Sequence, residues 1–260
     1  MKKILLSTTV LVASAGFAAA EITISGSAAM DVNYSDSAAQ KTTVAGSIDL
    51  DWDASFAADN GLSMAVHMDG VTTSNADVSL SGDFGKVTFG SPSNAEGTVA
   101  AKGAGSVDLT AENYITGTTD ARWDYTMDGI SIAVSGNSNG DNTSAGLKYT
   151  SGSLAIAVAT NNAGSNVSWN GVSVGTTLGS LAVTAMAANR DGTSSNGVGA
   201  TFDASDLGLG SVTLAFANKE GQANTWGVDM SKDLGGLTLN AQWTSVNGTD
   251  TASAGITMGF

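Results

Sequence analysis

The stretch EITISGSAAMDVNY, residues 21–34, decides the fold. Its even positions are mostly apolar, whereas its odd positions are Glu, Thr, Ser, Ala, Asp and Asn. A side-chain period of two belongs to a β-strand with one apolar and one polar face. Residues 43–56 repeat the pattern, and no apolar stripe of helical period competes with it. Both runs are longer than the roughly five or six residues of an ordinary globular strand.

The alternation continues to the end of the chain and is punctuated by turn signals such as Asp128-Gly129. It predicts sixteen strands, with fourteen as the smaller count that uncertain boundaries allow. In the tenth strand, Trp169 is out of phase with Val172 and Val174, which predicts a bulge or a later strand start. Connections after odd-numbered strands are long and polar, and those after even-numbered strands are tight, except for residues 203–210. Outer-membrane barrels have this layout.

The composition indicates what the two faces meet. The 260 residues are 42% hydrophobic and only 13% charged, with no Cys and a formal net charge of −14. The lack of Cys excludes disulfide scaffolds and thiol catalysis, and the acidic excess argues against nucleic acid as a partner. Sixteen strands in one closed sheet enclose a lumen too wide for side chains to fill. We therefore expect an all-β fold, a closed antiparallel transmembrane β-barrel with water inside and lipid outside.

Residues 1–20 have the features of an export signal. Lys2 and Lys3 precede the short apolar stretch Ile4–Phe17, and Ala18-Ala19-Ala20 is a small-residue cleavage site. The apolar stretch is shorter than the roughly 18 residues needed to span a membrane. The sequence predicts a cleaved signal peptide at 1–20 and a barrel domain at 21–260.

Several motifs together resemble a known family. They are the start Glu21-Ile-Thr-Ile-Ser-Gly, the hairpin SGDFGKVTFG at 81–90, the strand RWDYTM at 122–127 and the terminal Phe260. With the export signal and one long connection after the fifth strand, they resemble the 16-stranded general diffusion porins of Gram-negative outer membranes, in particular the α-proteobacterial type. The resemblance covers the whole chain. It implies a homotrimer surrounded by outer-membrane lipid and lipopolysaccharide, with short turns in the periplasm and a third loop folded into the lumen.

Residues 91–120 form the predicted constriction loop, because a connection near thirty residues inside a compact domain is usually functional or disordered. In the resembled family this loop narrows the pore. The charged candidates on the loop are Glu96, Lys102, Asp108, Glu112 and Asp120, with Asp108 and Glu112 as the first choice. The polar register of the strands supplies the pore wall, with candidates Asp31, Asp49, Asp51, Asp53, His67, Asp69, Asp77, Lys86, Arg122, Asp124 and Lys148.

The charges on the early strands predict the selectivity. Pores of the resembled family usually set a basic wall cluster against an acidic loop, but here the early strands carry Asp. Rings of carboxylates favour cations. We expect a water-filled, weakly cation-selective channel for passive diffusion of ions and small hydrophilic solutes. Nearly all aromatic residues are on the apolar register, which favours a non-specific pore over a sugar-specific one.

Two other classes of function stay open: an outer-membrane adhesin or structural barrel, and a secreted soluble β-sheet protein that binds carbohydrate. The direction of the long loop distinguishes transport from adhesion, since an inward loop favours a pore. An enzyme is not expected, because the only His, His67, lacks an oriented set of catalytic partners.

Closure of the barrel and bound ions give the last expectations. The first and last strands of a closed barrel are neighbours, which predicts an ion pair between the amino group of mature Glu21 and the carboxylate of Phe260. No cofactor is expected beyond loosely bound Ca²⁺, for which the candidates are the loop Asn137–Asn142 with Asp141, and Asp191 with its neighbours.

Overall fold

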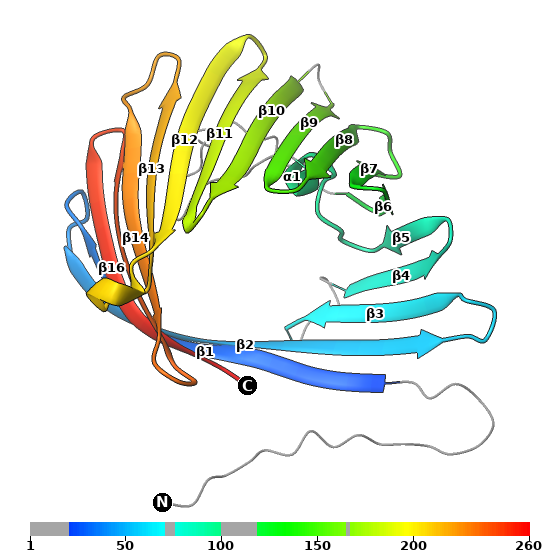
Figure 1. Ribbon diagram of the computed structural model, residues 1–260, viewed down its shortest axis with the longest axis horizontal. Coiled ribbons are helices and arrows are strands. Elements are labelled where there is room, and N and C mark those ends of the chain that lie inside the picture. Colours follow the sequence, from blue (N-terminus) through cyan, green and yellow to red (C-terminus); the bar gives the residue numbers. More distant parts are fainter. Residues whose placement is uncertain (1–20, 71–75, 100–118, 165–166) are drawn as a thin grey trace, which may run out of the picture.

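The computed structural model describes residues 21–70, 76–99, 119–164 and 167–260. Sixteen strands form one closed antiparallel barrel in which each strand pairs with its neighbours in sequence, and β1 pairs with β16 (Figure 1). The predicted fold class and the count of sixteen are confirmed. The strands are β1 (Glu21–Ser35), β2 (Thr42–Ala57), β3 (Ser63–Asp69), β4 (Ala76–Gly82), β5 (Gly85–Phe89), β6 (Ala121–Met127), β7 (Ile130–Gly136), β8 (Asn142–Ser151), β9 (Leu154–Ala163), β10 (Val167–Leu178), β11 (Leu181–Arg190), β12 (Thr193–Asp203), β13 (Ser211–Lys219), β14 (Thr225–Asp233), β15 (Thr238–Val246) and β16 (Thr249–Gly259).

The barrel wall is uneven in height. Strands β1 and β2 have 15 and 16 residues, β3 to β7 have only five to seven, and β8 to β16 have nine to twelve. The described residues also form two short helices, α1 (Glu96–Val99) and η2 (Ser205–Leu207). Neither is long and apolar enough to cross a membrane.

Strand register keeps one face of the sheet apolar around the whole barrel. Directly paired residues point to the same face, and apolar residues pair with one another from strand to strand, as Trp52 does with Met68 and Leu214 with Val228. Many side chains on this face are exposed, among them Val44 at 71% and Ile48 at 75%. An exposed apolar band of this extent faces lipid in a barrel.

The seam between β1 and β16 corrects one prediction. The N–H of Phe260 donates to the carbonyl oxygen of Gly26 at 3.0 Å, and the N–H of Gly26 donates to the carbonyl oxygen of Phe260 at 2.9 Å. Glu21 lies five residues before Gly26 on β1, so it is offset from the chain end by about 16 Å along the strand. The predicted ion pair between Glu21 and Phe260 is wrong, because register at the seam places the C-terminus beside Gly26.

Strand β10 corrects another prediction. Its pairing with β9 and β11 runs without interruption through Trp169, which lies opposite Asn161 on one side and Arg190 on the other. Both the bulge and the later strand start predicted from the out-of-phase Trp169 are wrong, because β10 begins at Val167 and pairs regularly with β9. Val172 and Val174 point outward, whereas Trp169 belongs to the inward register and is 0% exposed.

Candidate functional site: the channel lumen

The start of the predicted constriction loop identifies the lumen face. We call residues 91–99 the loop stem; it includes α1, which contacts β7, β8 and β9 inside the ring of strands (Figure 1). The N–H of Ala95 donates to Ser135 Oγ at 2.9 Å and to Ser144 Oγ at 2.8 Å. The face that carries these two serines is therefore the inner one, and the described stem of the loop folds inward.

A row of paired residues connects this face to the opposite side of the barrel. Each member lies opposite the next on the neighbouring strand, so all share the inner face. The row runs through Ser135, Arg122, Thr88, Ser79, Ala65 and Ser55. Because side chains alternate along a strand, Asp49, Asp51 and Asp53 point to the same side as Ser55. The predicted wall residues of β2 thus face the lumen.

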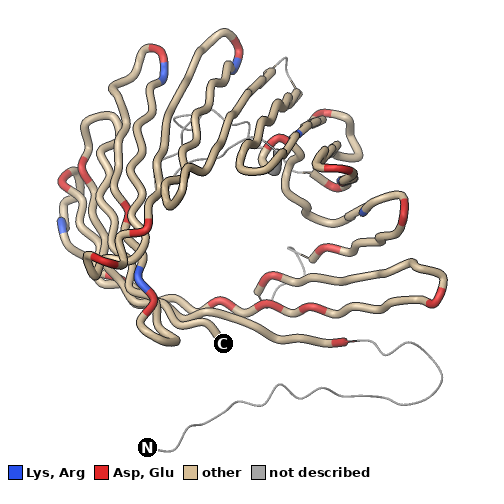
Figure 2. The backbone as a smooth tube through the Cα atoms, in the orientation of Figure 1, with Lys and Arg blue, Asp and Glu red and all other residues tan. Residues whose placement is uncertain are grey.

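Strands β1 to β4 form what we call the acidic wall. No Lys or Arg lies on these four strands, whereas acidic residues do (Figure 2). Pairing places six aspartates on the inner register: Asp31, Asp49, Asp51, Asp53, Asp69 and Asp77. Carboxylate oxygens of Asp49, Asp51 and Asp69 lie within 4.8 Å of one another. His67 stands among them, with Nδ1 at 2.8 Å from Asp53 Oδ1. Such a surface concentrates negative potential inside the barrel.

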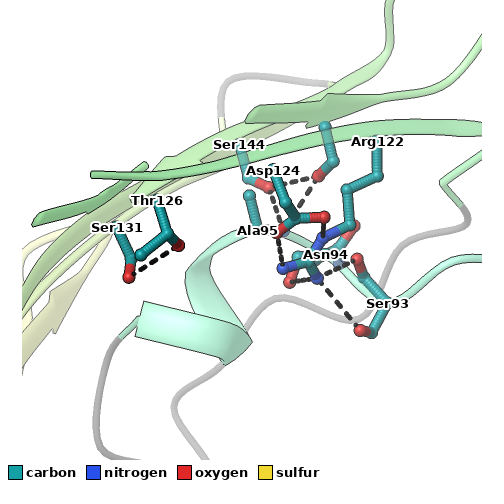
Figure 3. A network of polar contacts seen from close by, with 9 residues as sticks. Ser93, Asn94, Ala95, Arg122, Asp124, Thr126, Ser131 and Ser144 are labelled. Atoms are coloured by element: carbon teal, nitrogen blue, oxygen red, sulfur yellow. Dashed lines mark hydrogen bonds and ion pairs between the residues drawn. The ribbon is translucent and has the colours of Figure 1, made fainter. Parts of the chain in front are cut away.

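Arg122 clamps the loop stem to the opposite wall (Figure 3). Its guanidinium donates from Nε to Asp124 Oδ2 at 2.8 Å and from NH2 to Asp124 Oδ1 at 2.6 Å. NH1 donates to the carbonyl oxygen of Ser93 at 2.9 Å, to Ser93 Oγ at 3.1 Å and to the carbonyl oxygen of Asn94 at 3.4 Å. Arg122 is only 7% exposed. The sequence placed Arg122 and Asp124 as charges on the pore wall; they face inward, but they bind each other and the loop.

Both ends of the loop are fastened by further side chains. Asp77 Oδ1 accepts the N–H of Ser91 at 2.6 Å, at the point where β5 passes into the stem. At the other end, Asp120 Oδ2 accepts the N–H of Ser138 at 2.8 Å. The backbone N–H of Ser138, followed by its side chain, holds the pKa of Asp120 below its ordinary value. Asp120 therefore ties the loop to the β7–β8 connection.

The stem is also joined to the wall through Asn94. Its Oδ1 accepts a hydrogen bond from Thr119 Oγ1, and it accepts another from Asn142 Nδ2 at 3.1 Å. Thr119 lies at the far end of the loop and Asn142 begins β8. One amide therefore links the two ends of the loop to the barrel.

Glu96 points to the wall and away from the lumen water. It is 2% exposed, and its Oε1 accepts the side-chain N–H of Asn161 on β9 at 2.8 Å. Of the other predicted loop charges, Lys102, Asp108 and Glu112 lie outside the described residues. On the wall, Lys86 pairs with Asp124 across β5 and β6, and Lys148 pairs with Ser131 across β7 and β8. Both are on the inner register, as predicted.

Several inward residues were not identified from the sequence. Asn161, Ser135 and Ser144 receive the stem, and Trp169 packs in one buried cluster with Ala95. The phase of Trp169 was the available signal, since a Trp on the polar register of a strand faces the lumen when the strand is regular. Among the polar positions of the strands, nothing in the spacing distinguishes serines that bind a loop from serines that face water.

The proposed Ca²⁺ loops use some of their oxygens internally. Asn137 Oδ1 accepts the N–H of Asn142 at 3.1 Å, and Asp191 Oδ1 accepts the N–H of Ser168 at 2.7 Å. These bonds close turns between strands, a common use of Asn and Asp side chains. Loose Ca²⁺ binding there stays a prediction.

Comparison with known proteins agrees with this architecture. A family model described as "Gram-negative porin" matches residues 7–259. The chain belongs to the Gram-negative porins. It is accordingly an outer-membrane channel, and the expectation of a porin is confirmed. No curated protein matches the sequence.

Solved porin structures share the fold. A mutant porin of Rhodopseudomonas blastica with two acidic residues replaced by alanine superimposes with a TM-score of 0.75 at 12% identity. A tryptophan-substituted mutant of the same porin gives a TM-score of 0.73 at 12% identity. Each comparison covers 92% of this chain and 100% of the other. At this identity the likeness concerns the barrel alone.

Proposed function

We propose that this porin is weakly cation-selective and that the acidic wall sets the preference. The observation that carries the proposal is the run of six inward aspartates on β1 to β4, without a single Lys or Arg on those strands. Carboxylates that line a water-filled pore attract cations and repel anions. Ions and small hydrophilic solutes would pass by passive diffusion, and the inward loop stem favours transport over adhesion.

Charge neutralisation in planar bilayers tests the proposal. The reversal potential under a salt gradient should show cation preference for the natural protein. Replacing Asp49, Asp51 and Asp53 by Asn should lower the cation-to-anion permeability ratio by about half without closing the pore, because half of the wall aspartates become neutral.

The matched control changes the same net charge elsewhere. Asp128, Asp191 and Asp206 are exposed in the β6–β7, β11–β12 and β12–β13 connections, away from the acidic wall, and replacing them by Asn should leave the ratio unchanged. Anion preference in the natural protein would refute the proposal. Equal shifts in the two triple variants would show that net charge, and not the wall, sets the preference.

We also propose that the porin is a homotrimer in which β3 to β7 meet the neighbouring copies. A transmembrane strand needs about 9–11 residues to cross the bilayer, whereas these strands have five to seven. Their outer face is nevertheless apolar, with Met64, Leu80 and Phe89 exposed. We call the outer face of β3 to β7 the low side. A second copy would cover it, and the taller strands β8 to β16 would face lipid and lipopolysaccharide.

A pair of charge insertions tests the trimer. Leu80→Asp, on the low side, should yield folded monomers, because a carboxylate would be buried at the contact between copies. Leu214→Asp, on the taller side, should keep the trimer and weaken membrane insertion instead. Chemical cross-linking and counting of equal closing steps measure the outcome, and a trimer that survives Leu80→Asp would contradict the proposed interface.

A further inference from the structure

We infer that Glu96 is a positioning residue, which with Asn161 latches the loop stem to β9, and that it is not one of the charges that select ions. The two side chains are 65 positions apart in the sequence and meet on the inner wall through the bond from Asn161 Nδ2 to Glu96 Oε1 at 2.8 Å. Glu96 is 2% exposed and Asn161 is 0% exposed. A carboxylate enclosed in this way does not present its charge to passing ions.

The burial of Glu96 and Asn161 makes the latch depend on the single hydrogen bond between them. Glu96 Oε2 and Asn161 Oδ1 are buried, and within the described residues neither has a hydrogen-bond partner. The Glu96–Asn161 bond is therefore the polar contact that holds this carboxyl in its buried position. Ala95, next to Glu96, packs with Trp169 in the buried cluster, so apolar packing and the latch act on the same turn of chain.

The latch and the clamp fasten neighbouring residues of the stem. Arg122 holds Ser93 and Asn94 through three hydrogen bonds, whereas Asn161 holds Glu96 through one. If the latch opens while the other bonds stay closed, the helix α1 can leave β9 with Ser93, Asn94 and Ala95 still attached to the wall. We therefore expect loss of the latch to produce brief fluctuations of the channel current, with the barrel intact.

A polarity swap provides the test in single-channel recordings. Glu96→Gln keeps an acceptor for Asn161 and should leave both the current trace and the permeability ratio unchanged. Asn161→Asp places two carboxyls against each other and should raise the frequency of closures about tenfold or more. In the double variant Glu96→Gln with Asn161→Asp, the new amide donates to the new carboxylate, and the steady trace should return.

Controls separate the latch from charge and from misfolding. Asn162→Asp adds the same charge one position along β9 at an exposed site, and it should leave the trace steady. Heat-modifiable migration on gels reports whether each barrel is folded. If Asn161→Asp does not fold, Asn161→Ala removes the donor without adding a charge and should still raise the closure frequency.

Two results would overturn the inference. A fall in the permeability ratio for Glu96→Gln, comparable with that of Asp51→Asn, would make Glu96 a selectivity charge. A double variant that flickers as much as Asn161→Asp, or a steady trace for Asn161→Ala, would remove the latch. The inference stands apart from the proposed cation preference, because closure frequency and its rescue are measured whichever ion the pore prefers.

Discussion

The acidic wall on β1 to β4 and the wall on β6 to β10 use the same alternation for different purposes. On the acidic wall, inward aspartates reach the lumen, and Asp49, Asp53 and Asp69 are exposed. On the other wall, many inward side chains are small or uncharged and buried around the loop stem: Ala133, Ser135, Ser144, Ala157, Ala159 and Asn161.

The difference shows that burial within a lumen depends on the size of the inward residues as well as on their polarity. Small side chains let another segment approach the sheet closely, and a close approach fills space that water would occupy. Charged side chains on the acidic wall keep their hydration, so they stay available to solutes. Arg122 is the exception, since it is charged and buried, and it is satisfied by Asp124 and by the carbonyl oxygen of Ser93.

The largest effect is expected from removing the buried Arg122 side chain. Arg122→Ala should lower the free energy of unfolding by about 3 kcal/mol, because it leaves Asp124 and the stem carbonyls without their shared donor. The folded fraction should show an unstable current, as the stem loses its clamp. Lys86→Ala is the control, since Lys86 is exposed and pairs with the same Asp124 in register. Thermal unfolding in detergent measures both, and equal losses would contradict the clamp.

The next largest effect is expected from close packing on the wall of β6 to β10, which we call the loop-bearing wall. A β-carbon at Gly171 would meet ring carbons of Trp169 at 2.2 and 2.5 Å, whereas at Gly175 the nearest atom would be Thr184 Oγ1 at 3.5 Å. Gly171→Ala should cost about 1–3 kcal/mol by displacing the indole. Gly175→Ala, on the same face of the same strand, should be neutral or stabilising by up to about 1 kcal/mol. Thermal unfolding and tryptophan fluorescence report both, and a harmless Gly171→Ala would mean that the indole has room to move.

These two walls also show which features a sequence can predict. Alternation placed the aspartates of β2 on the inner face, because a side-chain period of two is a local property of each strand. It did not identify the partners of Arg122 or Glu96, since Glu96 meets Asn161 across 65 positions and Arg122 meets Ser93 across 29. Such contacts depend on which strands the loop crosses, and local spacing carries no record of that path.

The register between β1 and β16 could not be predicted from the sequence for the same reason. The pairing of β1 and β16 required them to be neighbours, but their stagger follows from the whole circuit of strands. The chain end therefore lies at Gly26 instead of Glu21. In β10, by contrast, the local pattern contained enough information to predict the strand correctly. A regular strand with Trp169 pointing inward fits the alternation, and no bulge is needed.

A smaller effect on the permeability ratio is expected from the salt concentration. It tests whether the exposed charges of the acidic wall govern permeation. Screening lengths shrink from about 10 Å at 0.1 M to about 3 Å at 1 M salt. If the exposed acidic wall sets the cation preference, the permeability ratio should fall toward unity as the salt concentration rises. The triple variant of Asp49, Asp51 and Asp53 to Asn should show a flatter salt dependence. A ratio that stays constant up to 1 M would show that exposed wall charges do not govern permeation.

The smallest effect is expected at the rim of the loop-bearing wall, where Asp120 accepts the N–H of Ser138. Hydrogen bonds from Ser138 lower the pKa of Asp120 below its ordinary value of 3.8. A lowered folded pKa means that the contact stabilises the protein above pH 3.8 and that this contribution is lost as the pH falls through the folded pKa. The melting temperature of the natural protein should therefore exceed that of Asp120→Asn at neutral pH, and the two should converge in strong acid.

Ser138→Ala separates the two donors at this contact. It removes the hydroxyl but keeps the backbone N–H, which is the larger cause of the lowered pKa, so most of the pH-dependent difference from Asp120→Asn should remain. Because Asp120 is partly exposed to solvent, the difference in melting temperature should be small beside that of Arg122→Ala. A gap between the natural protein and Asp120→Asn that persists unchanged in strong acid would mean that the carboxylate charge does not hold this end of the loop.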